Sequence, residues 1–282
     1  MNLLTLWLWP LVGLILLPTA LVYFGLHVVG RGIIFVDLAL AQIAALGIAV
    51  AALLGADPGH GTLPYALAVL FTMGGAALFS LTRFRHPRVP HEAIIGIIYI
   101  VAAAAATLVL SRTAAGDEEI KNLLVGNILL VSRLEVLRTL ALYVLVGALH
   151  FVLRRRFHMI SFEPEEAVRQ GIRVRLWDFA FYATFGLVVT SFVRIAGVYL
   201  VFSYLIVPAV CAALLSSRTA ARLAIGWVVA FTAGISGLLL STQWESLDLP
   251  TGPTIICIFG LLLLLSGVVT WVRARSSARA GG

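Results

Sequence analysis

The sequence predicts an all-α, polytopic membrane protein, and three observations support this class. Hydrophobic residues make up 61% of the chain and charged residues only 12%, whereas about 25% of residues are charged in a typical soluble domain. Apolar runs long enough to cross a bilayer as helices recur along the whole chain. The alternating ten-residue pattern of an outer-membrane β-barrel is absent. We therefore expect an inner-membrane helical bundle that forms a single transmembrane domain over residues 1–282.

Nine apolar runs approach the ~20 residues that a helix needs to cross the hydrocarbon core. They lie near residues 3–26, 33–55, 63–82, 92–111, 134–153, 177–194, 196–215, 220–241 and 253–273. The first run lacks the basic start and small-residue cleavage site of a signal peptide, so it is interpreted as a span. The sixth and seventh runs meet at Arg194 and Ile195. They form either a tight hairpin or one span broken at Gly197, so the chain has eight or nine spans, with nine preferred.

The basic residues predict the orientation, because loops on the cytoplasmic side of a membrane are enriched in Lys and Arg. With nine spans and the N-terminus outside, 15 of the 20 basic residues fall in inner segments. This orientation places the C-terminus and the loop at residues 154–177 in the cytoplasm. The segment 113–132 does not fit a span, and we expect an outer-side or re-entrant element there, in which Asp117 caps a short helix.

The loop at residues 154–177 is the main polar interruption between the apolar runs. Its middle predicts a short helix, because a proline suited to the first helical turn stands beside acids, which are favourable near a helix N-terminus. A glycine that can end the helix follows. The residues concerned are Glu163, Pro164, Glu165, Glu166, Ala167 and Gly171. The helix is either a solvated surface element or a docking site for a cytoplasmic partner.

Asp37 is the clearest ionisable residue inside a span, and such residues are functional candidates because a charge in the bilayer is costly. It is either a cap or a partner of Arg31 near the cytoplasmic edge, or a carboxylate beside the path of a hard or borderline cation. Gln42 lies five residues further on, about 140° around the helix from Asp37. The two side chains therefore do not share one face and are not expected to chelate an ion alone.

Motifs for enzyme chemistry are absent from the sequence. The chain has no GxxxxGK[ST] loop and no GxSxG element, and its six histidines show no HxxxH or HExxH spacing. Cys211 and Cys257 lie in apolar runs and form no CxxC site, while His91 and Glu92 suit a helix N-terminus. We expect no enzymatic activity, no bound cofactor and no high-affinity metal site. The net charge of +7 does not predict nucleic-acid binding, because the basic residues lie at membrane edges.

Six blocks of the sequence resemble one known family. They are FVDLALAQIAALG at 35–47, HEAIIGIIY at 91–99, LLVGNILLVS at 123–132, FEPEEAVRQGIRV at 162–174, AGVYLVFSYLIVPAVCAALLS at 196–216 and LDLPTGPTIICIFGLLLLL at 247–265. The family is the membrane permease of ATP-binding-cassette importers for zinc, manganese or iron. The resemblance covers nearly the whole chain, and the last three blocks are the most specific.

This resemblance implies a mechanism and a set of partners. The segment 163–171 is similar to the coupling helix that seats in a cleft of a cytoplasmic ATPase, so ATP would bind to that partner and not to this chain. A periplasmic or lipoprotein metal-binding protein would deliver the substrate to two permease copies, and the metal would pass along their interface by alternating access. We expect a homodimeric divalent metal importer in the bacterial inner membrane, with zinc as the first candidate metal, followed by manganese or iron.

The chain departs from the family pattern at two places. The family's second span commonly reads Gly-Asp-x-Leu-Ala-His, but here Gln42 replaces the His, Leu38 occupies the Asp position, and Asp37 is offset by one residue. Asn127 stands where Gly-Asp-Ile-Leu is usual. Both changes remove ligands that a zinc path favours. Asp37 and Gln42 are therefore the candidate residues of the metal path, with the metal left open.

Two other classes of function remain as alternatives. The chief one is a stand-alone secondary transporter or channel, which usually carries coupling charges in mid-membrane and often has repeated halves. The sequence shows one partly buried Asp and no visible repeat, which argues against this class. The other alternative is a membrane subunit that anchors a complex without transporting a solute.

Overall fold

The computed structural model describes residues 3–56, 61–83, 89–113, 124–126, 131–243 and 249–280. Within these ranges the regular secondary structure is helical and contains no strand, which confirms the predicted all-α class. The helices are α1 (Leu3–Arg31), α2 (Val36–Leu53), α3 (Thr62–Thr82), α4 (His91–Leu110), α6 (Arg133–Val152), α7 (Arg154–Phe162), α8 (Pro164–Arg169), α9 (Val174–Ala196), α10 (Val198–Leu215), α11 (Thr219–Gln243) and α12 (Thr251–Ala280).

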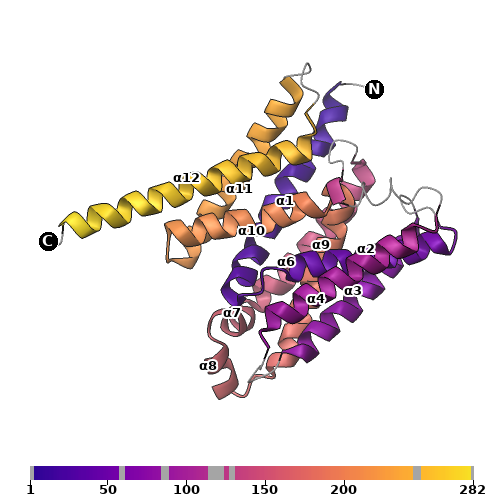
Figure 1. Ribbon diagram of the computed structural model, residues 1–282, viewed down its shortest axis with the longest axis horizontal. Helices are drawn as coiled ribbons and strands as arrows, with labels where there is room; N and C mark the ends of the chain where they lie inside the picture. The colour runs from indigo at the N-terminus through magenta and orange to yellow at the C-terminus, as the bar shows by residue number, and fades with distance from the viewer. Residues whose placement is uncertain are drawn as a thin grey trace.

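Nine of the described helices are long and apolar enough to cross a membrane, all except α7 and α8. This count confirms the preferred number of spans among the described residues. The sixth and seventh runs are two helices, since α9 ends at Ala196 and α10 begins at Val198. Figure 1 shows α7 and α8 together at one end of the bundle, opposite the N-terminus.

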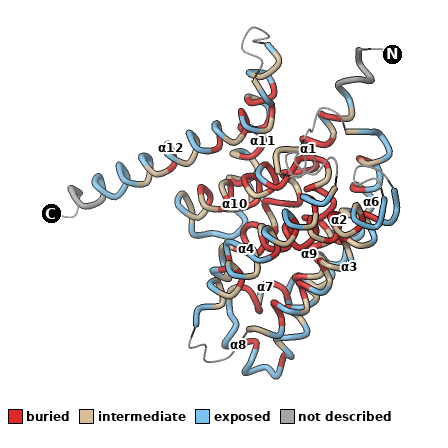
Figure 2. Tube along the Cα trace, turned by 45° about the vertical axis from the view of Figure 1, so that its right-hand side comes forward, coloured by how far each residue is buried: buried red, intermediate tan, exposed pale blue. Residues whose placement is uncertain are grey.

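Helix α2 lies at the centre of the bundle, packed mainly against α3 and α4 and also against α9. Its apolar window is 72% buried, compared with 17% for that of α12, and Figure 2 shows the buried residues concentrated in the middle of the bundle. Glycines allow the close contacts, because a Cβ at Gly75 of α3 would collide with Ile43 of α2, and a Cβ at Gly47 of α2 would collide with the backbone of Leu67 in α3. The small residues of the second span therefore mark a central helix, as small residues do at many membrane helix interfaces.

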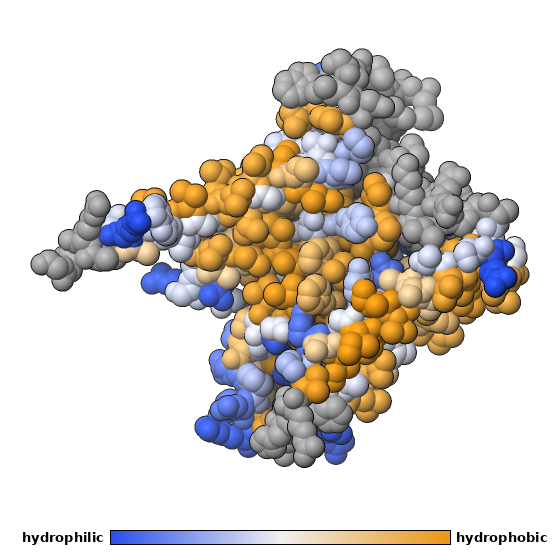
Figure 3. All heavy atoms as spheres, in the orientation of Figure 1, coloured by the Kyte–Doolittle hydropathy of each residue, from blue (hydrophilic) through white to orange (hydrophobic). Residues whose placement is uncertain are grey.

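The outer helices α4, α6 and α12 expose large apolar side chains, among them Leu108, Leu145 and Leu264. Figure 3 shows apolar surface over much of the bundle, with hydrophilic residues gathered at the α7–α8 end and near the tip of α12. Such extensive apolar surface is unusual for a monomeric soluble protein. It suits helices that face lipid or other membrane subunits.

Two glycines hold the corner between α9 and α10 against the segment 124–126. Gly126 and Gly197 have φ values of +63° and +78°, a region that glycine enters without steric cost. A Cβ on either one would collide with the backbone of the opposite segment. Residues 124–126 belong to the predicted outer-side or re-entrant segment 113–132. Most of that segment, including Asp117 and Asn127, lies outside the described residues.

We predict that Gly197→Ala lowers the stability of the protein by more than about 2 kcal/mol, because the added methyl group combines a left-handed φ with a backbone collision. The matched control is Gly267→Ala in α12, where a Cβ meets no atom within 4 Å. The measurement is thermal unfolding in detergent. Equal melting temperatures for the two variants would show that the corner tolerates a side chain.

Candidate functional site

The polar loop between α6 and α9 contains two helices, of which the sequence predicted only the second. The first, α7, buries Phe157, Ile160 and Ser161 against the bundle. Its Phe157 ring stacks on the ring of His150 in α6, with 4.1 Å between the ring centroids. Helix α7 thereby attaches the loop to the membrane-spanning helices and positions α8 beyond it.

Helix α8 is built from the local signals that the sequence carries. Pro164 occupies the first helical turn, and Ala167 is fully buried. At the other end the Gly171 N–H donates to Val168 O (3.1 Å) and the Ile172 N–H to Ala167 O (3.0 Å). With Gly171 at a φ of +71°, these bonds form the Schellman motif that satisfies the last carbonyls of a helix. The predicted helix and its terminator are therefore present.

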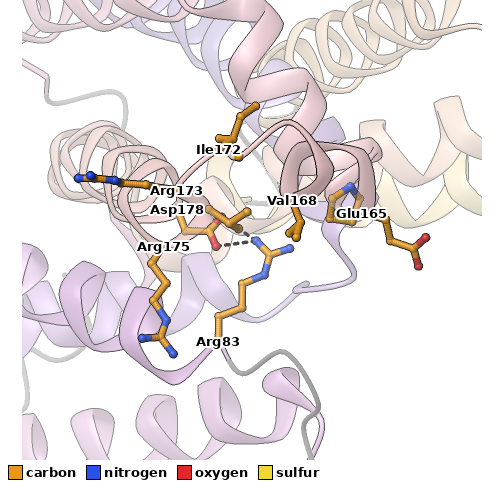
Figure 4. Close-up of a pocket in the computed structure, with 10 residues that line it drawn as sticks. Arg83, Glu165, Val168, Ile172, Arg173, Arg175 and Asp178 are labelled. Atoms are coloured by element: carbon orange, nitrogen blue, oxygen red, sulfur yellow. Dashed lines mark hydrogen bonds and ion pairs between the residues drawn. The ribbon is translucent and has the colours of Figure 1, made fainter.

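The acids of α8 differ in their surroundings. Glu163 is the exposed N-cap residue and makes no side-chain capping bond. Glu166 accepts a hydrogen bond from Gln170 (2.9 Å) and pairs with Arg169 at 3.8 Å. Glu165 is exposed, and Figure 4 shows its carboxylate directed away from Arg83 and Asp178. The outer face of α8 thus presents negative charge to solvent.

Behind α8 lies a hollow of about 670 Å³, lined partly by Glu165, Val168, Arg83 and Asp178. Figure 4 shows Arg83 reaching across this hollow to Asp178. Its floor is therefore an ion pair between the end of α3 and the first turns of α9. The hollow separates the outer face of α8 from the charges that hold the spans together.

Asp178 is a completely buried carboxylate that binds two arginines. Its Oδ1 accepts from Nη1 of Arg31 at 2.9 Å, and both of its oxygens accept from Nη1 of Arg83 at 2.6 and 2.7 Å. The side chain of Arg31 is only 1% exposed. It also donates from Nε to Ser161 Oγ at 2.9 Å and lies over the ring of Phe181 at 3.8 Å. These contacts join α1, α3, α7 and α9 at the α8 end of the bundle.

Asp37 lies in the first turn of α2 and is only 2% exposed. The predicted alternative of a pair with Arg31 is wrong, because Arg31 binds Asp178 instead. Asp37 Oδ1 is buried and has no hydrogen-bond partner. Nearby, Glu92 of α4 accepts a hydrogen bond from the Phe35 N–H (2.9 Å). Both acids therefore lie at the N-terminus of α2, where the helix dipole favours negative charge.

Gln42 is also buried in α2, with 7% of its surface exposed. Within the described residues no side chain bridges Gln42 and Asp37. The helical spacing keeps these two residues on different faces of α2. Among the described residues, no group of three or more His, Cys, Asp or Glu side chains comes together. The candidate path residues are thus two separate polar groups within α2, one of the two most buried spans.

Comparison with known proteins decides the family. The model of the ABC 3 transport family matches residues 5–270, almost the entire chain. The chain belongs to the ABC 3 transport family. Membership confirms the resemblance that the sequence blocks indicated. It identifies a multi-pass bacterial membrane protein that is a transport subunit and not an enzyme.

Individual relatives of this ABC 3 family protein agree with the match. The manganese transport system membrane protein MntC of Halalkalibacterium halodurans is 24% identical over 226 residues, 76% of each chain. The chelated iron transport system membrane protein YfeD of Yersinia pestis is 24% identical over 186 residues, 66% of this chain and 61% of that protein. The structure of PsaBC from Streptococcus pneumoniae in complex with Fab has the same fold, with a TM-score of 0.75 at 20% identity, covering 93% of this chain and 90% of that one.

The sequence interpretation of this ABC 3 family protein missed its most heavily paired acid. Asp178 lies five residues into α9, so the rule that marks an ionisable residue in a span as a functional candidate applies to it as well as to Asp37. It was passed over because the predicted span began at residue 177, which placed Asp178 at a membrane edge. The N-terminal position predicted for Glu92 is correct, but its backbone partner belongs to a different helix, α2.

We predict that Asp178→Ala destabilises the protein by about 3–5 kcal/mol, because it leaves the buried Arg31 charge unpaired. The double variant Asp178→Leu with Arg31→Met is expected to recover much of that loss, since it removes both buried charges. Glu166→Ala is the control, because its pair with Arg169 is exposed and contributes less than about 1 kcal/mol. The measurement is the melting temperature in detergent. If Asp178→Ala is as stable as Glu166→Ala, the ion cluster around Asp178 does not stabilise the fold.

Proposed function

We propose that the chain is the membrane permease of an ATP-driven importer for a divalent metal ion, located in the bacterial inner membrane. The observation that carries the proposal is the exposed, acidic helix α8 on a protein of the ABC 3 transport family. The printed functions of two relatives, manganese and chelated iron transport, support a metal as the solute. The sequence lacks a phosphate-binding loop, so the energy source would be a separate ATPase.

The residues and the relatives support different metals to different degrees. Zinc was the first candidate from the sequence, followed by manganese or iron, but the names of the relatives favour the latter two. Asp37 and Gln42 offer a carboxylate and an amide, whose oxygens suit hard cations such as Mn²⁺. A zinc path is expected to be rich in His and Cys instead. We therefore place manganese or iron ahead of zinc, with Asp37 and Gln42 as residues of the metal path.

Helix α8 is the proposed docking and coupling helix for the cytoplasmic ATPase. Its buried Ala167 fixes it to the bundle, while Glu163 and Glu165 are exposed to a partner. Only residues 170–173 separate α8 from α9, and Asp178 follows in the first turns of α9. A displacement of α8 would thus pull directly on the charges that join α1, α3 and α9.

The remaining features of the proposal follow from the charge distribution and the family. The 15 basic residues in inner segments support an external N-terminus and a cytoplasmic α8 and C-terminus. The exposed apolar faces of α4 and α12 offer surface for a second permease copy. We propose a homodimer with two ATPases and an external metal-binding protein, which moves the metal along the permease interface by alternating access.

We predict that the double variant Glu165→Arg with Glu166→Arg abolishes co-purification with the ATPase while leaving membrane insertion intact. Reversing two charges on the outer face of α8 replaces attraction to the partner by repulsion, whereas the bundle contacts of Ala167 are unchanged. The matched control is Arg275→Glu near the tip of α12, far from α8 (Figure 1). ATPase recovered in normal yield with the double variant would rule out α8 as the docking helix.

We predict that the complex of permease, ATPase and binding protein in liposomes hydrolyses ATP faster with Mn²⁺ or Fe²⁺ than with Zn²⁺. Asp37→Asn, which keeps the shape of the side chain, is expected to lower metal uptake about tenfold because one charged ligand of the path is lost. The readouts are metal-stimulated ATPase activity and uptake of each metal. Failure of all three metals to stimulate a stable complex would disprove metal import, and wild-type uptake by Asp37→Asn would remove this residue from the path.

A further inference from the structure

A second hollow of about 310 Å³ lies among α1, α6 and α11, away from α8 and from α2. Its walls are mainly apolar and include Phe24 of α1, Val146 of α6 and Leu223 of α11. Helices α6 and α11 each pack on α1 but not closely on one another. The hollow is therefore a groove along α1 whose two sides are different membrane-spanning helices.

The length of this groove corresponds to most of one leaflet of a bilayer. The residues that α6 contributes follow one helical face from Tyr143 to Phe151, and Arg154 at the start of α7 comes next. This advance of about eight residues rises by roughly 12 Å, most of one leaflet of the ~30 Å hydrocarbon core. The groove ends where α6 meets α7, so it covers the leaflet on the α7–α8 side.

Gly147 keeps the groove open at its middle. It lies on the α6 face that lines the groove, and a Cβ built on it meets no atom within 4 Å. A larger residue at this position would extend into the groove without colliding with the protein. The space is thus available to a ligand and is not needed by the packing of the bundle.

The polar side chains that line the groove differ in their hydrogen bonding. The His150 ring is satisfied, because Nδ1 hydrogen-bonds to the Tyr23 hydroxyl (3.2 Å) and Nε2 to the Thr184 hydroxyl (2.8 Å). The indole Nε1 of Trp227, however, is buried without a hydrogen-bond partner. Because this N–H has almost no accessible surface, Trp227 presents the apolar part of its ring to the groove.

The end of the groove near α7 is positively charged. Arg154 lines this end with its guanidinium over the Phe151 ring at 4.8 Å, and it is followed directly by Arg155 and Arg156. All three arginines are exposed, and no Asp or Glu lines the groove. The groove thus combines an apolar channel of nearly leaflet length with a cationic mouth.

We propose that this groove binds an anionic phospholipid of the leaflet on the α7–α8 side. One acyl chain lies along Gly147 between α6 and α11, and the phosphate contacts Arg154. Basic pockets between membrane-spanning helices bind anionic head groups in this way. The proposal does not depend on which solute the protein transports.

Trp227 is a natural reporter for the test. The purified full-length chain is placed in phosphatidylcholine vesicles that contain increasing amounts of phosphatidylglycerol or phosphatidylcholine with brominated acyl chains, which quench tryptophan fluorescence on contact. The Trp227 signal is the difference between the wild type and Trp227→Phe. We expect brominated phosphatidylglycerol to quench it at about fivefold lower mole fraction, which corresponds to one arginine–phosphate contact.

Two pairs of variants separate the site from general effects. Arg154→Gln is expected to remove most of the preference for the anionic lipid, and Gly147→Leu to reduce quenching of Trp227 by either lipid. Their matched controls, Arg275→Gln and Gly267→Leu in α12, should behave like the wild type. Gel filtration checks that every variant is folded.

Three outcomes would overturn the proposal. The first is equal quenching by the two brominated lipids in the wild type. The second is an Arg154→Gln variant that keeps the full preference, or an Arg275→Gln control that loses it equally. The third is that neither lipid quenches Trp227 and that Gly147→Leu shifts the protein to monomers. This result would mean that a second copy of the chain covers the groove.

Discussion

The ion cluster around Asp178 is the constraint on which the rest of the architecture depends. A carboxylate with no exposed surface accepts hydrogen bonds from an arginine at the end of α1 and another just after α3, and Ser161 of α7 holds the first of these arginines from the other side. Burying such charges is costly unless all of them are paired. The cluster therefore requires the ends of four helices to meet at one point, and loss of Asp178 would leave the buried Arg31 charge unpaired.

This cluster lies directly behind α8, which gives the proposed coupling a physical route. Helix α8 is short, ends in a Schellman motif at Gly171 and is joined to α9 by only a few residues. Helix α7 attaches it to α6 through the stacked rings of Phe157 and His150. Packed elements with few soft joints transmit a displacement instead of absorbing it. The hollow behind α8 provides space for such a displacement.

The two polar regions of the bundle serve different purposes. Asp37 and Glu92 both lie at the N-terminus of the central helix α2 and leave carboxylate oxygens without partners, an arrangement expected beside a cation path. The groove among α1, α6 and α11 is apolar, has a basic mouth and faces away from α2. One region is suited to an ion within the protein, and the other to a lipid at its edge. Helices α1 and α9, which pack on one another and are joined by the Asp178 cluster, lie between them.

Local chemistry by itself determined the fold class, the spans and helix α8. In a bilayer each helix must satisfy its own backbone, so apolar runs alone reveal the membrane-spanning segments, and α8 follows from Pro164, its neighbouring acids and Gly171. Only the tertiary structure decided that Arg31 pairs with Asp178, 147 residues away, and not with the nearby Asp37. It also decided that Glu92 caps a neighbouring helix and that Gly147 opens a groove. These contacts depend on which helices lie side by side, and hydrophobic periodicity carries no information about that choice, because lipid and protein neighbours are equally apolar.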